Sequence, residues 1–73
     1  MSFKRGDRVL YVPSHGPAER GIVKRMSDDG LAAFVLYDTG LMRYTEADLD
    51  NYTCARTSLS DLVAVPQVSR EGG

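Results

Sequence analysis

Cysteine, histidine and tryptophan are scarce in this 73-residue sequence, which has one cysteine (Cys54), one histidine (His15) and no tryptophan. A single cysteine cannot form an internal disulfide, which argues against a secreted disulfide scaffold and favours a cytoplasmic protein. A metal centre needs three or four converging His, Cys or carboxylate ligands. Since the only histidine and cysteine lie far apart in the sequence, we expect no metal site.

Long hydrophobic runs and catalytic motifs are also missing. The longest uncharged apolar stretch, residues 30–37, is far shorter than the roughly 20 residues of a membrane-spanning helix, and the first residues do not resemble a signal peptide. A nucleophile at Ser14 or Cys54 would need His15 as its base, and that residue lies in a Pro/Gly turn without an orienting acid. No glycine pattern matches a phosphate-binding loop. The sequence therefore predicts no enzyme activity, no cofactor and no membrane segment.

Charge is divided unevenly along the chain, although the net charge is only −1. Residues 1–25 have a balance of +4 and residues 26–73 a balance of −5. Such a division permits a basic face on an acidic molecule, or two surfaces that attract each other. The candidate residues for nucleic-acid or anion binding are the six basic side chains of the first third: Lys4, Arg5, Arg8, Arg20, Lys24 and Arg25.

Short stretches rich in β-branched and aromatic residues, separated by turn formers, predict an all-β fold. The expected strands are residues 8–12, 19–26, 31–37, 51–56 and 63–65. Pro13 ends the first strand, and the Asp29-Gly30 pair is typical of a tight hairpin between the second and third strands. Four to five short strands predict one small, closed or nearly closed barrel over residues 1–68, with a flexible tail at 69–73.

Two segments fit a capping box, in which a hydroxyl residue precedes an aspartate by three positions. They are residues 45–49 and 58–62, and each could form the short helical turn that small barrels place before the last strand. We prefer residues 58–62 for that turn, which leaves residues 41–50 as an excursion between the third and fourth strands.

The third expected strand is apolar on both faces, which requires a second cover outside the barrel. Either Ala33, Val35 and Tyr37 or Phe34 and Leu36 face inward. The cover is either the excursion at residues 41–50 or another protein, most simply a second copy of the chain. The candidate partner or self-contact residues are Leu10, Phe34, Leu36 and Tyr44. The aromatic residues Tyr11, Phe34, Tyr37, Tyr44 and Tyr52 could fill the barrel, form a cage for a cation or stack on bases.

The run Phe3–Tyr11, followed by Pro13–Gly16 and Gly21–Val23, resembles the opening of the Tudor-like domain of CarD-type RNA-polymerase-binding proteins. With residues 34–38 and 60–63 included, the sequence also resembles small Src-homology-3-like, Tudor-like or KOW-like barrel proteins encoded by phages and prophages. These resemblances imply a five-stranded Src-homology-3-like barrel and, as partners, host proteins such as the transcription machinery.

The function expected from these observations is a noncatalytic interaction module, derived from a phage, that binds a host protein and forms a homo-oligomer through the third strand. Two alternatives remain open. One is a nucleic-acid binder that uses the six N-terminal basic residues, and the other is a protein that sequesters a small anionic ligand.

Overall fold

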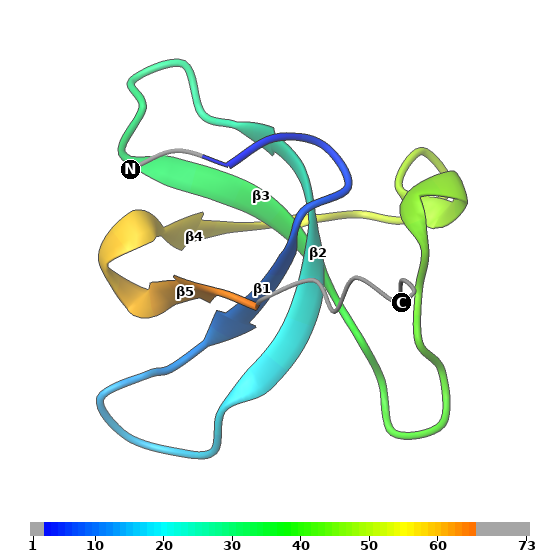
Figure 1. Ribbon diagram of the computed structural model, residues 1–73, viewed down its shortest axis with the longest axis horizontal. Helices are drawn as coiled ribbons and strands as arrows, with labels where there is room; N and C mark the ends of the chain where they lie inside the picture. Colours follow the sequence, from blue (N-terminus) through cyan, green and yellow to red (C-terminus); the bar gives the residue numbers. More distant parts are fainter. Residues whose placement is uncertain (1–2, 66–73) are drawn as a thin grey trace, which may run out of the picture.

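The computed structural model describes residues 3–65 as one antiparallel sheet of five strands (Figure 1). The elements are β1 (Arg8–Tyr11), β2 (Glu19–Met26), β3 (Ala32–Tyr37), the 3-10 turn η1 (Glu46–Asp48), β4 (Ala55–Ser58), the 3-10 turn η2 (Leu59–Asp61) and β5 (Leu62–Ala64). The strand order is β4-β3-β2-β1-β5. In this part of the chain no helix is long and apolar enough to cross a membrane.

The hairpin between β2 and β3 forms where the Asp-Gly pair predicts it. Gly30 has a positive φ of 73°, a conformation that a residue with a side chain rarely adopts. The turn is closed by backbone bonds from Ser27 N to Ala32 O at 2.8 Å and from Gly30 N to Ser27 O at 3.1 Å. The Asp29 carboxylate accepts bonds from the Ser27 hydroxyl and the Leu31 N–H, so it fixes the turn from inside.

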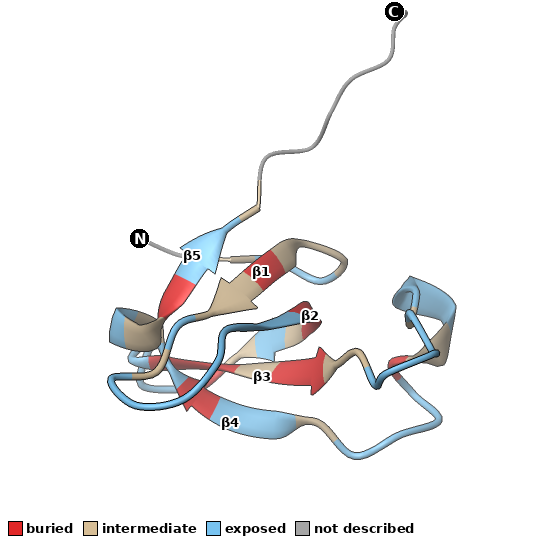
Figure 2. Cartoon of the chain, turned by 90° about the horizontal axis from the view of Figure 1, so that it is seen from below, coloured by how far each residue is buried: buried red, intermediate tan, exposed pale blue. Residues whose placement is uncertain are grey.

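The sheet curves but does not close by hydrogen bonding, so of the expected closed or nearly closed barrel the fully closed form is not seen. A register shift between Val23 and Arg25 marks a bulge in β2, and bulges increase the bend of a strand. β4 and β5 are the two edges, and η2 joins them at one end (Figure 2). An open seam therefore separates the two edge strands.

The inner face of the sheet carries the main core. Val9, Val23, Ala33 and Val35 are completely buried, and Leu62 is buried beside them. Of the two alternatives for β3, the set Ala33, Val35 and Tyr37 faces inward, because Ala33 and Val35 lie in this cluster and Tyr37 packs against it.

The outer face of β2 and β3 is covered by the chain itself. Leu49, which is completely buried, packs on Ile22 and Leu36, and Tyr44 and Cys54 surround this second cluster. Residues 41–50 are thus the second cover, although only part of them acts in this way. Leu41 and Met42 point into solvent at the tip of a hairpin closed by reciprocal bonds between Thr39 and Met42.

Two further details differ from the sequence prediction. The fourth strand is Ala55–Ser58 and not residues 51–56. Residues 51–54 form a turn and a loop after η1, and pairing with β3 places Thr57 opposite Ala33, where it is buried. Both candidate segments form 3-10 turns, but only the first has a capping box, between Thr45 and Asp48. The preferred second segment does precede the last strand, as η2. The predicted tail, residues 69–73, lies outside the described residues.

Candidate functional site

The predicted basic face is divided by ion pairs. Arg5 contacts Glu46 at 3.5 Å and Asp50 at 3.0 Å, so it ties the N-terminal loop to η1. Arg25 lies over the Phe34 ring, 4.3 Å from its centroid, and 3.9 Å from Asp28. Within residues 3–65, Lys4, Arg20 and Lys24 have no carboxylate within 4.0 Å.

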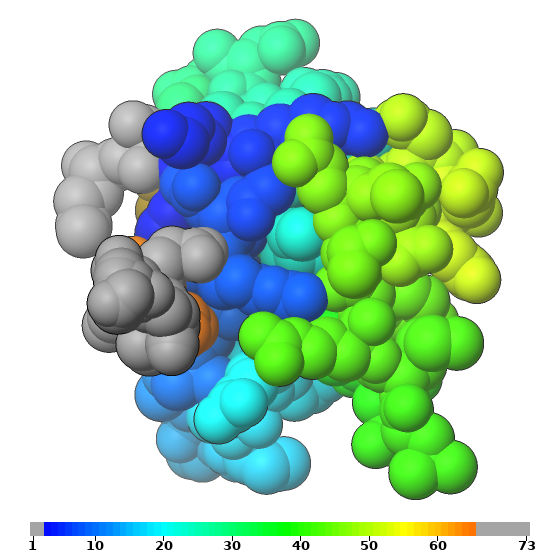
Figure 3. Space-filling view, turned by 45° about the vertical axis from the view of Figure 1, so that its right-hand side comes forward, coloured from blue at the N-terminus to red at the C-terminus, as the bar shows by residue number. Residues whose placement is uncertain are grey.

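Arg8 has a structural role that sequence reasoning missed. Its guanidinium donates a hydrogen bond to the Tyr44 carbonyl and lies 3.5 Å from the Asp38 carboxylate. The side chains of Arg8 and Asp38 are only 17% and 16% exposed, and Asp38 also accepts the Tyr44 N–H at 3.0 Å. This pair fixes the excursion against β1, which Figure 3 shows as green residues beside blue ones. Arg8 is therefore not free to contact a phosphate.

The predicted self-contact residues do not form one surface. Leu36 is 7% exposed beneath Leu49, and Tyr44 packs against the same cluster and on Tyr52, with ring centroids 4.8 Å apart. Phe34 lies under the Arg25 guanidinium. Leu10 is half-buried on β1, opposite the exposed Val63 of β5.

A groove lies at the open seam between the edge strands, and we call it the tyrosine groove. Tyr11 and Tyr37 lie in it with ring centroids 5.8 Å apart and their planes inclined by 56°. The Tyr37 hydroxyl shares a 2.6 Å hydrogen bond with Thr57, which fixes the ring against β4. The groove has a volume of about 340 Å³ and is lined by Tyr11, Tyr37, Ala55, Arg56, Thr57, Ser58 and Asp61.

The electrostatics of the tyrosine groove are negative on the side of β1. Burial raises the pKa of Tyr37 above its ordinary value, the bond to Thr57 lowers it, and nearby Tyr11, Glu19 and Asp61 raise it further. Among residues 3–65, no basic group lies within 4.0 Å of Glu19 or Asp61. Arg56 contributes little positive charge because Asp29 pairs with it at 3.0 Å.

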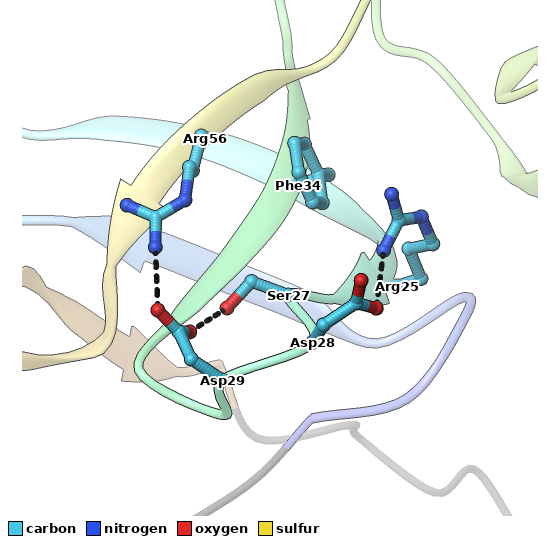
Figure 4. Close-up of a pocket in the computed structure, with 6 residues that line it drawn as sticks. All are labelled: Arg25, Ser27, Asp28, Asp29, Phe34 and Arg56. Carbon is cyan, nitrogen blue, oxygen red and sulfur yellow. Dashed lines mark hydrogen bonds and ion pairs between the residues drawn. The ribbon is translucent and has the colours of Figure 1, made fainter.

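A second hollow, which we call the arginine hollow, lies on the other side of β4. It has a volume of about 290 Å³ and is lined by Arg25, Ser27, Asp28, Asp29, Phe34 and Arg56. Figure 4 shows both guanidiniums held by aspartates of the β2–β3 turn, with Phe34 between them. Two positive and two negative side chains leave this hollow without net charge.

The described part of the chain contains neither a cluster of metal-ligating side chains nor a pairing of His15 with Cys54. No group of three or more His, Cys, Asp or Glu side chains could hold a metal ion there. His15 is exposed in the loop between β1 and β2. Cys54 was predicted to lie in the fourth strand, but it is half-buried beside the outer cluster in the loop before β4. The two residues do not form a catalytic pair.

The tyrosine groove was only partly visible in the sequence. Tyr11 and Tyr37 belong to the set of aromatic residues proposed for the core, a cage or a stacking platform. Arg56, Thr57 and Asp61 carried no signal, because they come to the site only when β4 and η2 return beside β1.

Comparison with known proteins gives little further guidance. No family model matches the sequence, and no solved structure matches it. One curated relative, a phosphoglucosamine mutase of Azorhizobium caulinodans, is 34% identical over 67 residues. That alignment covers 92% of this chain but only 14% of the mutase, so it does not show membership of the mutase family.

Proposed function

We propose that this protein is a noncatalytic interaction module with a Src-homology-3-like barrel fold, and that its tyrosine groove receives a basic side chain of a protein partner. The strand order supports this fold, because β1 lies between β2 and β5, and a single 3-10 turn joins β4 to β5. Such a turn before the last strand is common in small barrels.

The observation that carries the proposal is the tilted pair of Tyr11 and Tyr37 in a groove lined by Asp61, which has no basic partner within 4.0 Å among residues 3–65. A cation over an aromatic face gains about 0.5–1 kcal/mol at exposed sites and about 2 kcal/mol when desolvated. Asp61 lines the groove and Glu19 lies near Tyr37, so both favour a positive charge there. The long aliphatic part of a lysine or arginine can pack on the rings while its charged end reaches Asp61.

The alternative functions lack comparable support. Nucleic-acid binding relies on basic side chains that neutralise phosphates, and three of the six candidates, Arg5, Arg8 and Arg25, already contact carboxylates of their own chain. A site for a small anion would need uncompensated positive charge, and the arginine hollow has two aspartates for its two arginines.

The source and the partner of the protein remain predictions. Phage origin and a host partner rest on the sequence resemblance alone. Because Leu36 is covered by Leu49, the reason for predicting self-association through β3 no longer holds, and the proposal does not include a homo-oligomer.

The proposal is tested by titrating the ¹⁵N-labelled protein with Nα-acetyl-lysine methylamide, whose side-chain amine is free and charged, and with the neutral analogue Nα-acetyl-norleucine methylamide. We expect shifts at Tyr11, Tyr37 and Asp61, and an affinity for the lysine compound about 2- to 30-fold higher, which corresponds to the cation–π range above. Equal affinities, or shifts elsewhere on the molecule, would show that the groove does not select a cation.

A further inference from the structure

We infer that the free edge of β4 takes an added strand, so that the partner of this protein is an extended segment with lysine or arginine at alternate positions. The inference rests on the proposed function of the tyrosine groove and adds to it the conformation and the spacing of the ligand. It follows from the direction of the backbone groups on β4 and from the positions of the two hollows.

The register of β3 and β4 shows which backbone groups of β4 are free. Leu59 donates its N–H to the Leu31 carbonyl at 3.0 Å, immediately beyond the pair Ala32–Ser58. Leu31 and Leu59 are therefore a hydrogen-bonded pair. Hydrogen-bonded and non-hydrogen-bonded pairs alternate along antiparallel strands, so Ala32–Ser58 is not bonded, Ala33–Thr57 is bonded and Phe34–Arg56 is not.

The N–H and C=O of Arg56 and the N–H of Ser58 therefore point away from β3. The Ser58 carbonyl lies at the start of η2, where it can accept the first bond of that turn. Since β4 is an edge strand, no other strand of the described sheet pairs with these groups. An added strand could bond to all three.

The two hollows lie where the side chains of such a strand would go. Side chains of a β-strand alternate between its faces, and strand addition obtains affinity from main-chain bonds and specificity from pockets for alternate residues. A residue paired with Arg56 would place its side chain on the outer face, at the arginine hollow beside Phe34. Its two neighbours would face the tyrosine groove.

Charge complementarity selects the occupant of each position. The tyrosine groove, with Asp61 and nearby Glu19, favours lysine or arginine at the two inward positions. The arginine hollow is compensated internally and offers the Phe34 ring, so it favours an apolar residue at the outward position. The ligand pattern is basic-apolar-basic in an extended backbone.

The test uses the peptide acetyl-Val-Lys-Val-Lys-Val-amide and the same peptide N-methylated at its central valine. We expect binding of the first peptide to slow amide hydrogen exchange at Arg56 and Ser58. The amides of Ala55 and Thr57, which already bond to β3, should change little. N-methylation should weaken binding about tenfold or more, because it removes one main-chain bond and obstructs a second.

A protein variant provides an independent check. Arg56→Pro removes the outward N–H on an edge strand, where proline is tolerated, and Arg56→Ala retains that N–H while it removes the same charge. Both variants change the lining of the two hollows, so the comparison between them reports the N–H, and we expect Arg56→Pro to weaken peptide binding much more than Arg56→Ala. If Arg56→Pro does not fold, the N-methylated peptide still decides the question.

The outcomes separate this inference from the proposed function. If both lysine peptides bind equally and shift Tyr11 and Tyr37 without protecting Arg56, the groove binds a cation and strand addition is wrong. If acetyl-Val-Glu-Val-Glu-Val-amide binds as tightly as the lysine peptide and protects Arg56 and Ser58, the cationic groove is wrong and the strand edge stands. Absence of binding at millimolar peptide overturns both.

Discussion

Replacement of Gly21, the one glycine within the five strands, by alanine should strongly destabilise the protein. Gly21 lies on the inner face of β2, opposite Val9 on β1 and Tyr37 on β3. A Cβ at this position would lie 2.5 Å from Val35 Cγ1, 3.0 Å from the Leu36 carbonyl oxygen and 3.1 Å from Tyr37 Cδ1. The carbonyl belongs to the paired strand and cannot rotate away, so β2 and β3 would have to separate.

The size of the effect follows from opposing terms. Overpacking of a core costs about 1–3 kcal/mol, and the carbonyl contact places Gly21→Ala near the upper end. Reduced freedom of the unfolded chain returns about 0.4–1 kcal/mol. We expect a net loss of about 2 kcal/mol, a large part of the total for 73 residues at roughly 0.05–0.15 kcal/mol per residue.

The assay is urea unfolding followed by circular dichroism, with Tm as a second measure. A loss of about 2 kcal/mol should lower Tm by about 8–16 °C in a domain of this size. The matched control is Gly40→Ala, because a Cβ at Gly40 meets nothing within 4 Å and its φ is not positive. It should change stability by less than about 0.5 kcal/mol. A Gly21→Ala variant as stable as the Gly40→Ala control would refute the close approach of β2 and β3.

Three further predictions concern the covers and charges around the sheet. Leu49→Ala should lower the free energy of unfolding, measured in urea, by about 2–5 kcal/mol, because it leaves a cavity at the completely buried position over Ile22 and Leu36. A loss below about 0.5 kcal/mol would mean that residues 41–50 do not cover the outer face of the sheet. Arg8→Ala should lower the free energy of unfolding by about 1.5–3 kcal/mol, because it removes a hydrogen bond to the Tyr44 carbonyl and an ion pair with Asp38. Arg20→Ala should change it by less than about 0.5 kcal/mol, and equal losses would contradict the structural role of Arg8. Hydrogen bonds from Ser27 and Leu31 and the charge of Arg56 hold the pKa of Asp29 below its ordinary value of 3.8. The ionised carboxylate therefore stabilises the folded state above pH 3.8, and this contribution is lost as the pH falls through the lowered pKa. Asp29→Asn should therefore destabilise the protein at pH 6, and the difference from the wild type should disappear in acid; a difference that persists in acid would assign the effect to something other than charge.

The strands and turns of this protein were largely predictable from local sequence. β1, β2 and β3 follow the β-branched and aromatic runs, with ends within one residue of prediction, and Gly30 gives the hairpin the backbone that its positive φ requires. Local chemistry determines these features, so a local pattern reveals them. β4 was misplaced because its pattern of small and polar residues has no strong local signal, and its position depends on pairing with β3.

The candidate site was much less predictable than the fold. Tyr11 and Asp61 are 50 positions apart, and they share a groove only because β5 pairs with β1 and η2 precedes it. The ion-pair partners of the basic residues could not be predicted for the same reason. Arg8 and Arg5 looked available in the sequence, yet their partners Asp38 and Asp50 lie in a segment whose path no local pattern predicts.

The most direct test of a cation-selective tyrosine groove compares two charge-removing variants in the titration with the lysine compound. Asp61→Asn removes a carboxylate that lines the tyrosine groove, and Asp28→Asn removes a fully exposed one in the arginine hollow, across β4. We expect Asp61→Asn to weaken binding of the lysine compound several-fold and to leave binding of the norleucine compound unchanged, and we expect Asp28→Asn to change neither. Equal effects of the two variants, or none from Asp61→Asn, would contradict the claim that the tyrosine groove recognises a basic side chain.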